Sequence, residues 1–268
     1  MRDWHKYLIR ENNFSNNDRF DFTDEVLLRN FKNFKYKFKF KHFKKDQLNF
    51  TIYNFFKKEL DHKKTLFIGS GWGWVEYFLN SKKQIIASDI REEYIQYHRK
   101  NTRLNYKKID ILNQNTKKGL INKYDRIVVN NIEYLLNKNQ LKTCIRNLSK
   151  ILKKNGDLFF IFRSRDGFVQ RLIDDYLTYI ELKLIFFIKK LKKKNLYFTK
   201  NHHGFRRKVT EFIKLFNSDF NYISNYTDLY ETEYERLTII KKIKMSKLIS
   251  IIFFRSHPYL NIIHFKKN

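Results

Sequence analysis

Cysteine is almost missing from this chain, and its scarcity already excludes several kinds of site. The single cysteine, Cys144, rules out a disulfide within the chain and any cysteine-based zinc site. Cys144 also falls inside the amphipathic pattern LKTCIRNLSKIL, which predicts a small buried hydrophobic side chain and not a nucleophile. We therefore expect no metal site and no thiolate chemistry.

Long apolar runs are absent as well. No stretch approaches the ~18 uncharged apolar residues that are needed to span a bilayer. The first residues, MRDWHKYLIREN, lack the apolar segment of a secretory signal. These two absences predict a cytoplasmic protein, and they leave peripheral contact with a membrane open.

Acidic residues are outnumbered, with 27 Asp and Glu against 56 Lys and Arg, a net charge of +29 and a pI near 10.0. Such an excess is typical of proteins that bind nucleic acid, an anionic membrane or an acidic substrate. The alternative is a coding bias toward Lys, Asn, Ile and Phe that distributes lysine over the whole surface. Lysine clusters occur along the entire sequence, and this distribution favours the coding bias.

The sequence does contain a regular alternation of short apolar segments with amphipathic helical patterns. Strands and helices in this order form right-handed βαβ units and therefore a parallel, doubly wound sheet. With two further strands near the C-terminus, the expected fold class is α/β, with a mostly parallel, seven-stranded Rossmann-like sheet. The expected strands are 65–69, 84–90, 106–112, 124–132, 157–164, 220–230 and 259–268.

Two additions to this core are expected. Residues 31–45 alternate aromatic residues with lysine, which is typical of a strand or extended segment. We interpret residues 1–47 as an N-terminal extension packed on the core and residues 48–268 as one domain. A helical lid is expected at about 168–199, because the strand–helix rhythm stops after Gly167 and a long basic amphipathic pattern follows.

The stretch TLFIGSGWGWVEYFL, residues 65–79, has the composition of a ligand-binding turn. Three of the 7 glycines in the chain, at 69, 71 and 73, follow an apolar strand and precede a helix. Such a turn lets backbone N–H groups approach a polar or anionic ligand closely. Asp89 ends the next strand 20 residues after Gly69, where an acid can hydrogen-bond a ribose.

The glycine spacing selects among nucleotide ligands. The dinucleotide pattern is G-x-G-x-x-G, whereas here the third glycine comes one position early and Trp74 stands at the sixth position. A bulky side chain there obstructs the close approach of helix and strand that a pyrophosphate site needs. Asp110, after the third strand, is placed to reach an adenine edge. A ligand with ribose and adenine but no pyrophosphate therefore fits best.

At this point the chain resembles the class I S-adenosylmethionine-dependent methyltransferases, whose first motif is a strand ending in G-x-G-x-G. The match is GSGWG at 69–73. YDRIVVNNIEYLLN at 124–137 is similar to the family's fourth-strand motif, and KKNGDLFFIF at 153–162 to its turn into strand five. HHGFRRKVTEFIKLFNSDF at 202–220 looks like a segment of its small-molecule members. The resemblance covers about 48–166 well and 200–268 loosely.

The resemblance implies S-adenosylmethionine (SAM) as cofactor and methyl transfer to a small-molecule acceptor, with lipid- or glycan-linked acceptors included. It assigns cofactor contact to the glycine turn and to the ends of the second, third and fourth strands. The residues are Gly69, Ser70, Gly71, Trp72, Gly73, Asp89, Ile90, Asp110, Ile111, Asn130 and Asn131.

Catalytic residues are less defined. The family's usual acid two residues before the first glycine is Phe67 here, and its usual Leu-Glu-His is Ile132-Glu133-Tyr134. Candidates for a general base are Glu133, Tyr134, His202 and His203. The alternatives are a solvated loop position for the two histidines and a core position for Glu133 and Tyr134. A non-catalytic binding protein of the same fold stays an alternative.

Two partner hypotheses follow from the charge. The basic amphipathic helix expected at 168–194 suits peripheral contact with an anionic membrane, or simply a lid packed on the sheet. A nucleic-acid methyltransferase is the second alternative. The sequence argues against its common forms, because NNIE stands in place of N-P-P-Y and Cys144 is poorly placed for attack on a cytosine.

Overall fold

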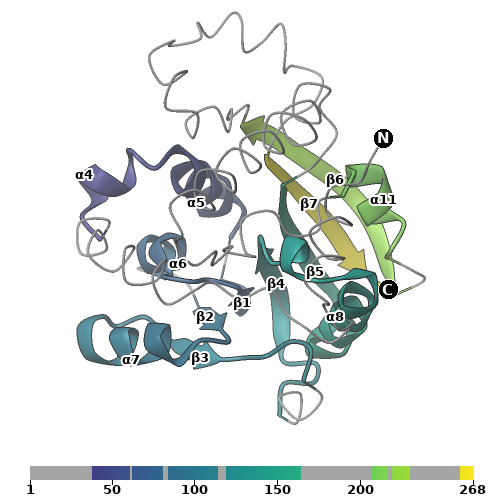
Figure 1. Cartoon of the computed structure of the whole chain (residues 1–268), viewed down its shortest axis with the longest axis horizontal. Helices are drawn as coiled ribbons and strands as arrows, with labels where there is room; N and C mark the ends of the chain where they lie inside the picture. The colour runs from purple at the N-terminus through teal and green to yellow at the C-terminus, as the bar shows by residue number, and fades with distance from the viewer. Residues whose placement is uncertain are drawn as a thin grey trace, which may run out of the picture.

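A computed structural model describes residues 38–60, 62–80, 84–113, 119–163, 207–216, 219–229 and 260–268. Its centre is a seven-stranded sheet in the order β3-β2-β1-β4-β5-β7-β6 (Figure 1). The strands are β1 Thr65–Ile68, β2 Ile85–Asp89, β3 Tyr106–Lys108, β4 Tyr124–Asn130, β5 Leu152–Arg163, β6 Phe220–Leu229 and β7 Leu260–Lys267. The helices are α4 Phe40–Phe43, α5 Gln47–Glu59, α6 Trp74–Leu79, α7 Glu92–Asn101, α8 Lys138–Ile151 and α11 Val209–Ile213, with a 3-10 turn, η3, at Glu133–Leu135.

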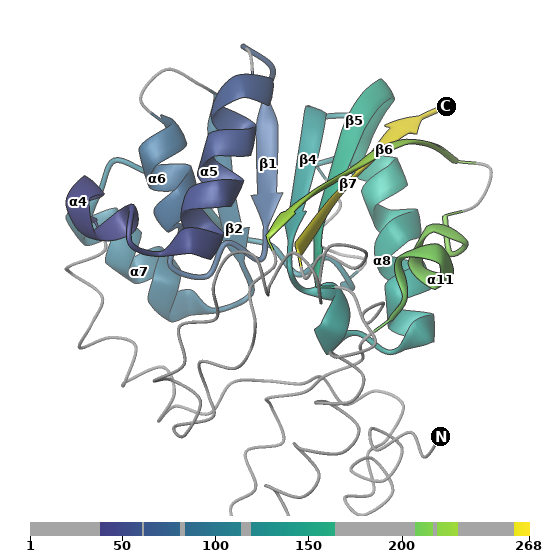
Figure 2. The ribbon, with the colours of Figure 1, turned by 90° about the horizontal axis from the view of Figure 1, so that it is seen from above.

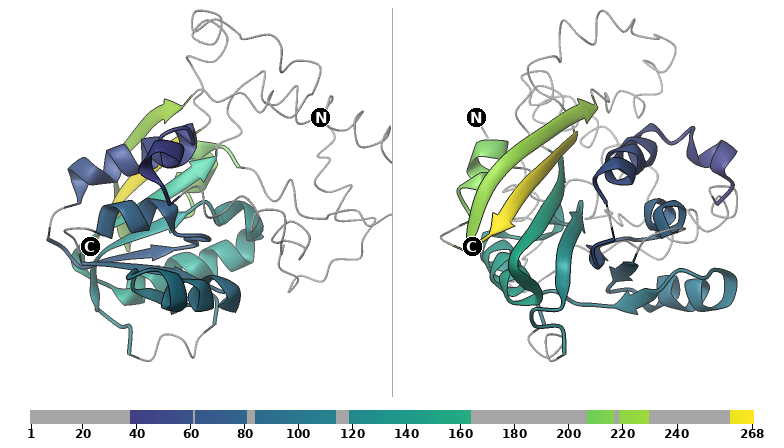
Figure 3. Two further views of the ribbon diagram at one scale, coloured as in Figure 1. Left: turned by 90° about the vertical axis from the view of Figure 1, so that its left-hand side faces the viewer. Right: turned by 180° about the vertical axis from the view of Figure 1, so that it is seen from behind.

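The predicted α/β Rossmann-like class is confirmed, but the sheet is mixed and not purely parallel. Strands β1 to β5 are parallel to their neighbours, whereas β7 runs antiparallel to both β5 and β6. The last strand of the chain thus inserts between β5 and β6, as the yellow strand in Figure 3 shows. Its long antiparallel ladder with β5 runs from Asp157 opposite Lys266 to Arg163 opposite Leu260.

Both faces of the sheet are covered, with α5, α6 and α7 on one face and α8 and α11 on the other (Figure 2). Along β1 the side chains alternate between the two cores, so that Phe67 packs with α5 and α6 while Leu66 and Ile68 pack on the α8 side. Cys144 is fully buried among the α8 core residues, as its pattern predicted. Burial raises the pKa of its thiol to about 12.

Three boundaries differ from the sequence-based expectation. Within the segment expected to be extended, residues 40–43 form helix α4. The i, i+3 spacing of Phe40 and Phe43 brings both rings against Phe78, and this packing outweighs the alternating pattern. Strand β3 ends at Lys108, before Asp110, and helix α8 ends at Ile151, so that β5 begins earlier than predicted.

The proposed division at residue 47 and the lid at 168–199 stay predictions. The segment 168–199 lies outside the described residues. No helix among the described ranges is long and apolar enough to cross a membrane. No group of three or more His, Cys, Asp or Glu within the same ranges is arranged to hold a metal ion.

Candidate active site

The glycine turn follows β1 at the edge of the sheet where the parallel strands end. All three of its glycines have positive φ, at 75° for Gly69, 52° for Gly71 and 64° for Gly73. Other residues rarely adopt this region, so the turn depends on glycine. The space around the three positions differs, however, and this difference indicates where a ligand can approach.

Two of the glycines are packed against protein and one is open. A Cβ at Gly69 would lie 2.2 Å from Ile132 Cγ2 and 2.9 Å from the Asn130 carbonyl oxygen. A Cβ at Gly73 would lie 3.3 Å from His98 Nε2. At Gly71, a Cβ would have no described atom within 4 Å. Gly71 is therefore the position at which a ligand can reach the backbone of the turn.

Side chains from β3 and α7 contact the backbone carbonyl groups of the glycine turn. The Tyr106 hydroxyl donates to the Gly71 carbonyl oxygen at 2.6 Å, and His98 Nε2 lies 3.0 Å from the Trp72 carbonyl oxygen. The two rings stack on each other with centroids 4.7 Å apart. Burial lowers the pKa of His98 to about 4, so its ring is neutral at physiological pH, with Nε2 as the donor.

Asp89 closes the turn from β2. Its Oδ2 accepts from the Gly71 N–H at 3.0 Å, and its Oδ1 accepts from the N–H groups of Ile90 and Arg91. Burial raises the pKa of Asp89, while these backbone donors oppose the rise. A carboxylate offers about four acceptor sites, so a ribose hydroxyl can still be bound beside these three contacts.

The residues after β3 divide into a turn and a core position. Asp110 is half-buried, and its Oδ1 accepts from the Leu112 N–H at 3.0 Å. Ile111 is only 5% exposed and belongs to the main core, where its carbonyl accepts from Asn147 Nδ2. The Ile111 side chain thus points into the protein core.

At the end of β4 the chain turns sharply beside Gly69. Asn131 has a φ of 52°, and its buried Oδ1 makes no hydrogen bond with any described residue. Glu133 follows and is 1% exposed. Arg207 holds this turn by donating to the carbonyl oxygens of Glu133, at 2.8 Å, and Leu136. Arg207 is thus engaged with backbone, and its positive charge faces Glu133.

The other predicted site residues differ in burial. Trp72 is 7% exposed and packs on Tyr94, and Ser70 is buried between the ends of β1 and β2. Ile90 is 41% exposed. His202 and His203 lie outside the described residues, as does the side chain of Tyr134.

Sequence reasoning missed the groups that support the turn. Tyr106 and His98 carry no motif, since their roles arise from contacts 35 and 26 residues away in the chain. Glu76 was missed too, although a charged residue on the inner face of a helix was a detectable signal. It is 1% exposed, its Oε1 has no hydrogen-bond partner among the described residues, and it bonds the Ser70 side chain.

These features define an α/β protein with a glycine turn and a neighbouring carboxylate at the carboxyl ends of its parallel strands. A family model described as "Methyltransferase domain" matches residues 66–156. That range contains the glycine turn, Asp89 and the turn after β4. Residues 66–156 thus carry a methyltransferase domain, and this match supports SAM-dependent methyltransferase activity with SAM as the cofactor.

Solved structures show the same fold at low sequence identity. A SAM-dependent methyltransferase from Thermotoga maritima, described as a possible histamine N-methyltransferase, has a TM-score of 0.57 at 14% identity, covering 91% of this chain and 97% of that one. A SAM-dependent methyltransferase from Methanosarcina mazei has a TM-score of 0.53 at 14% identity, over 78% and 94% of the two chains. Magnesium protoporphyrin IX methyltransferase from Synechocystis, with bound S-adenosylhomocysteine (SAH), has a TM-score of 0.51 at 13% identity, over 83% of each chain. Curated protein sequences give no match.

The residues of the turn fit this cofactor. Open space adjoins the backbone at Gly71 alone among the three glycines, and the Asp89 carboxylate lies directly beside it. The buried Asn131 Oδ1 offers a further acceptor at the same edge of the sheet. Gly71, Asp89 and Asn131 are therefore the residues that would hold SAM.

Tyr106→Phe is expected to weaken SAM binding about 5- to 10-fold, since it removes one hydrogen bond and leaves the Gly71 carbonyl unsatisfied. Tyr124→Phe is the matched control, because the buried Tyr124 hydroxyl has no hydrogen-bond partner among the described residues. Calorimetric titration with SAM measures both variants. Equal affinities in the two variants would show that Tyr106 does not support the turn.

Glu76→Gln is expected to change the pH dependence of stability. Burial raises the pKa of Glu76 to about 7, well above its unfolded value. A group whose pKa is raised by folding stabilises the folded state at pH values below its unfolded pKa. This stabilisation is lost as pH rises from the unfolded pKa through the folded-state pKa. The wild type should therefore lose up to about 3 kcal/mol between pH 4.5 and 7 relative to Glu76→Gln. Denaturant unfolding across this range measures the difference, and parallel curves would contradict it.

Proposed function

We propose that the enzyme transfers the methyl group of SAM to a small-molecule acceptor. The charge around the cofactor turn carries this proposal. Ionisable residues of both signs occur at this edge within the described ranges, the acids Asp89, Glu92, Glu93, Asp110 and Glu133 beside the bases Arg91, Lys108, Lys138 and Arg207. A nucleic-acid acceptor would need a run of phosphate-neutralising cations next to the site.

The named neighbours agree with this acceptor class. The Thermotoga protein is described as a possible histamine N-methyltransferase, and the Synechocystis enzyme methylates magnesium protoporphyrin IX. Both names refer to small molecules of very different shape, so they support a class of acceptor and no particular compound. Lipid- and glycan-linked acceptors belong to the same proposal.

The chemistry needs little from the protein beyond position. Bound SAM supplies an electrophilic methyl group on a sulfonium. Asp89 would accept hydrogen bonds from the ribose, the turn at Gly71 would leave room for the ligand beside the backbone, and the site would align the acceptor with the methyl group. Where the acceptor carries a proton, Glu133, Tyr134, His202 and His203 remain the proposed bases.

The acceptor class can be tested with SAM labelled in its methyl group. The purified protein is incubated with low-mass metabolites, total lipid and total RNA from one cell extract, each supplied separately, and Asp89→Ala gives the background. Incorporation into the low-mass fraction, or into lipid-linked precursors, supports the proposal. Incorporation into RNA alone would overturn it.

A further inference from the structure

A group of positively charged side chains lies at the edge of the sheet opposite the cofactor turn. There β1, β4 and β5 begin, α5 and α8 end, and β7 reaches its last residues. Hydrogen bonds join these ends, since Arg126 Nη1 donates to the Glu59 carbonyl and Lys267 Nζ to the carbonyls of Ser149 and Leu152. We name this surface the basic edge. Its exposed lysines are Lys57, Lys58, Lys63, Lys150, Lys153 and Lys154.

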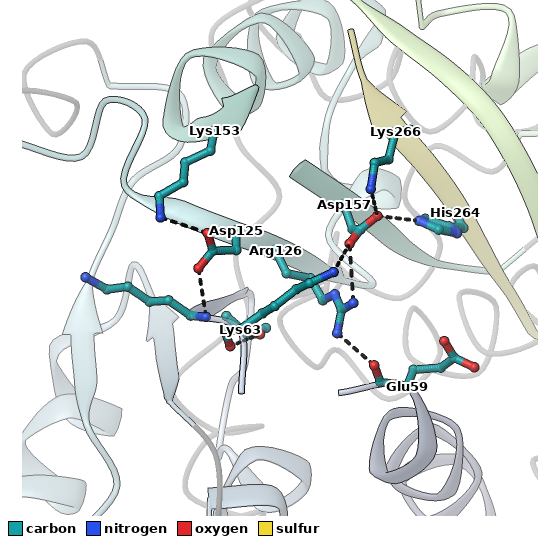
Figure 4. A network of polar contacts seen from close by, with 10 residues as sticks. Glu59, Lys63, Asp125, Arg126, Lys153, Asp157, His264 and Lys266 are labelled. Carbon is teal, nitrogen blue, oxygen red and sulfur yellow. Dashed lines mark hydrogen bonds and ion pairs between the residues drawn. The ribbon is translucent and has the colours of Figure 1, made fainter. Parts of the chain in front are cut away.

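The centre of the basic edge is a buried carboxylate with an excess of cations around it (Figure 4). Asp157 is 4% exposed, and its two oxygens lie 3.3 Å from Arg126 Nη2, 3.3 Å from Lys63 Nζ and 3.0 Å from Lys266 Nζ. His264 Nε2 adds a contact at 3.1 Å. Three permanent cations thus share one anion, so the network keeps a net positive charge.

The outer cations of this network are oriented but still reach solvent. The side chains of Lys63 and Lys266 are 43% and 39% exposed. Nearby, Lys153 Nζ contacts Asp125 at 2.7 Å while 47% of its side chain is exposed. These ammonium groups are anchored on one side by buried or half-buried acids and open on the other. They can therefore bind a second anion at a reduced cost in side-chain entropy.

Exposed apolar side chains lie at the same edge. Ile121 is 61% exposed in the turn before β4, and this turn is bonded to the end of α8 through Asn122 N–H and the Lys150 carbonyl. Tyr222 and Ile223, 47% and 52% exposed, lie at the start of β6, where Asn221 pairs with Lys266. Lysines beside exposed apolar side chains suit a bilayer surface, which offers anionic head groups and an apolar interior.

We propose that the basic edge docks the protein on an anionic phospholipid surface. The surface is distinct from the helix expected at 168–194, which lies outside the described residues. Strand β4, with 7 residues, separates the basic edge from the cofactor turn by roughly 20 Å. The active site then faces away from the bilayer, which favours an acceptor in solution over the lipid-linked acceptors included in the proposed function. On this proposal the lysines of the basic edge bind lipid head groups, whereas the sequence alone favours a coding bias.

Vesicle sedimentation tests this docking with two matched variants. Lys58→Gln/Lys150→Gln/Lys154→Gln removes three charges from the basic edge. Lys41→Gln/Lys45→Gln/Lys142→Gln removes three exposed charges elsewhere. With vesicles of phosphatidylcholine and phosphatidylglycerol, the first variant should bind about 100-fold more weakly and the second less than about 3-fold. Vesicles of phosphatidylcholine alone should bind neither variant nor the wild type.

Equal losses of vesicle affinity in the two variants would overturn the proposal, since binding would then depend on the net charge and not on the basic edge. Binding of a labelled RNA duplex that the first variant loses, without vesicle binding by the wild type, would overturn it in favour of nucleic acid. Ile121→Ser should leave low-salt binding nearly intact and reduce the binding that survives high salt. SAM titration of every variant checks that the protein is folded. It also distinguishes a protein that does not bind vesicles from one that does not bind SAM.

Discussion

Alanine at Gly71 is expected to weaken SAM binding on the order of 100-fold, equivalent to about 2.7 kcal/mol, while the protein stays folded. A Cβ at this position would meet no described atom within 4 Å, so the fold has room for it. The φ of 52° costs about 1 kcal/mol for a non-glycine residue. The added methyl group would occupy the open side of the turn, where the ligand approaches the backbone.

Gly69→Ala is the contrasting variant, because its Cβ would lie 2.2 Å from Ile132 Cγ2. We expect a loss of about 1–3 kcal/mol in the free energy of unfolding, as in other overpacked sites. Combining it with Ile132→Ala should recover part of this loss. Denaturant unfolding and calorimetric titration with SAM separate the two effects. Full SAM affinity in a folded Gly71→Ala protein would show that the ligand does not lie against this turn.

Asp157→Ala is expected to reduce the free energy of unfolding by about 3 kcal/mol. The reason is Arg126, whose side chain is 6% exposed and loses its carboxylate partner in this variant. Removing one member of a buried ion pair leaves an uncompensated charge, which costs far more than the pair itself contributes. Lys63 and Lys266 reach solvent and add little to the loss.

Asp125→Ala is the control, since its pair with Lys153 is partly exposed on both sides and should be worth less than about 1 kcal/mol.

Burial alone would raise the pKa of Asp157, but hydrogen bonds from His264 and Lys266 and the charge of Arg126 hold it well below its usual range. A group whose pKa is lowered by folding stabilises the folded state at pH values above its unfolded pKa. This stabilisation is lost as pH falls from the unfolded pKa through the folded-state pKa. The difference between wild type and Asp157→Ala should therefore be constant from pH 8 to about 5 and shrink below about 4. Equal losses in Asp157→Ala and Asp125→Ala would contradict this account.

Local and periodic features were predictable from the sequence. The alternation of strands and helices gave the Rossmann-like class, because each segment carries its own hydrophobic period. The glycine turn and Asp89 were predictable from spacing, and they lie together, with the Gly71 N–H bonded to Asp89. Burial of Cys144 followed from its place on the apolar face of α8.

The remaining features depend on contacts between distant segments. No local pattern states that β7 inserts between β5 and β6, because strand order follows from pairing and not from composition. The support of the turn by Tyr106 and His98, and the network around Asp157, link residues that are far apart in the chain. The alternating aromatic segment misled for a related reason, since packing of Phe40 and Phe43 on Phe78 decides its helical form.

The most direct test of the cofactor site is calorimetric titration of the wild type and Asp89→Ala with SAM, SAH and NAD. Asp89 lies beside the open position of the turn and is the chain's ribose-binding acid in this account. We expect micromolar affinity for SAM and SAH in the wild type, a loss of both in Asp89→Ala, and no binding of NAD. Absence of SAM and SAH binding, or equal affinity in Asp89→Ala, would contradict the assignment of the turn to this cofactor.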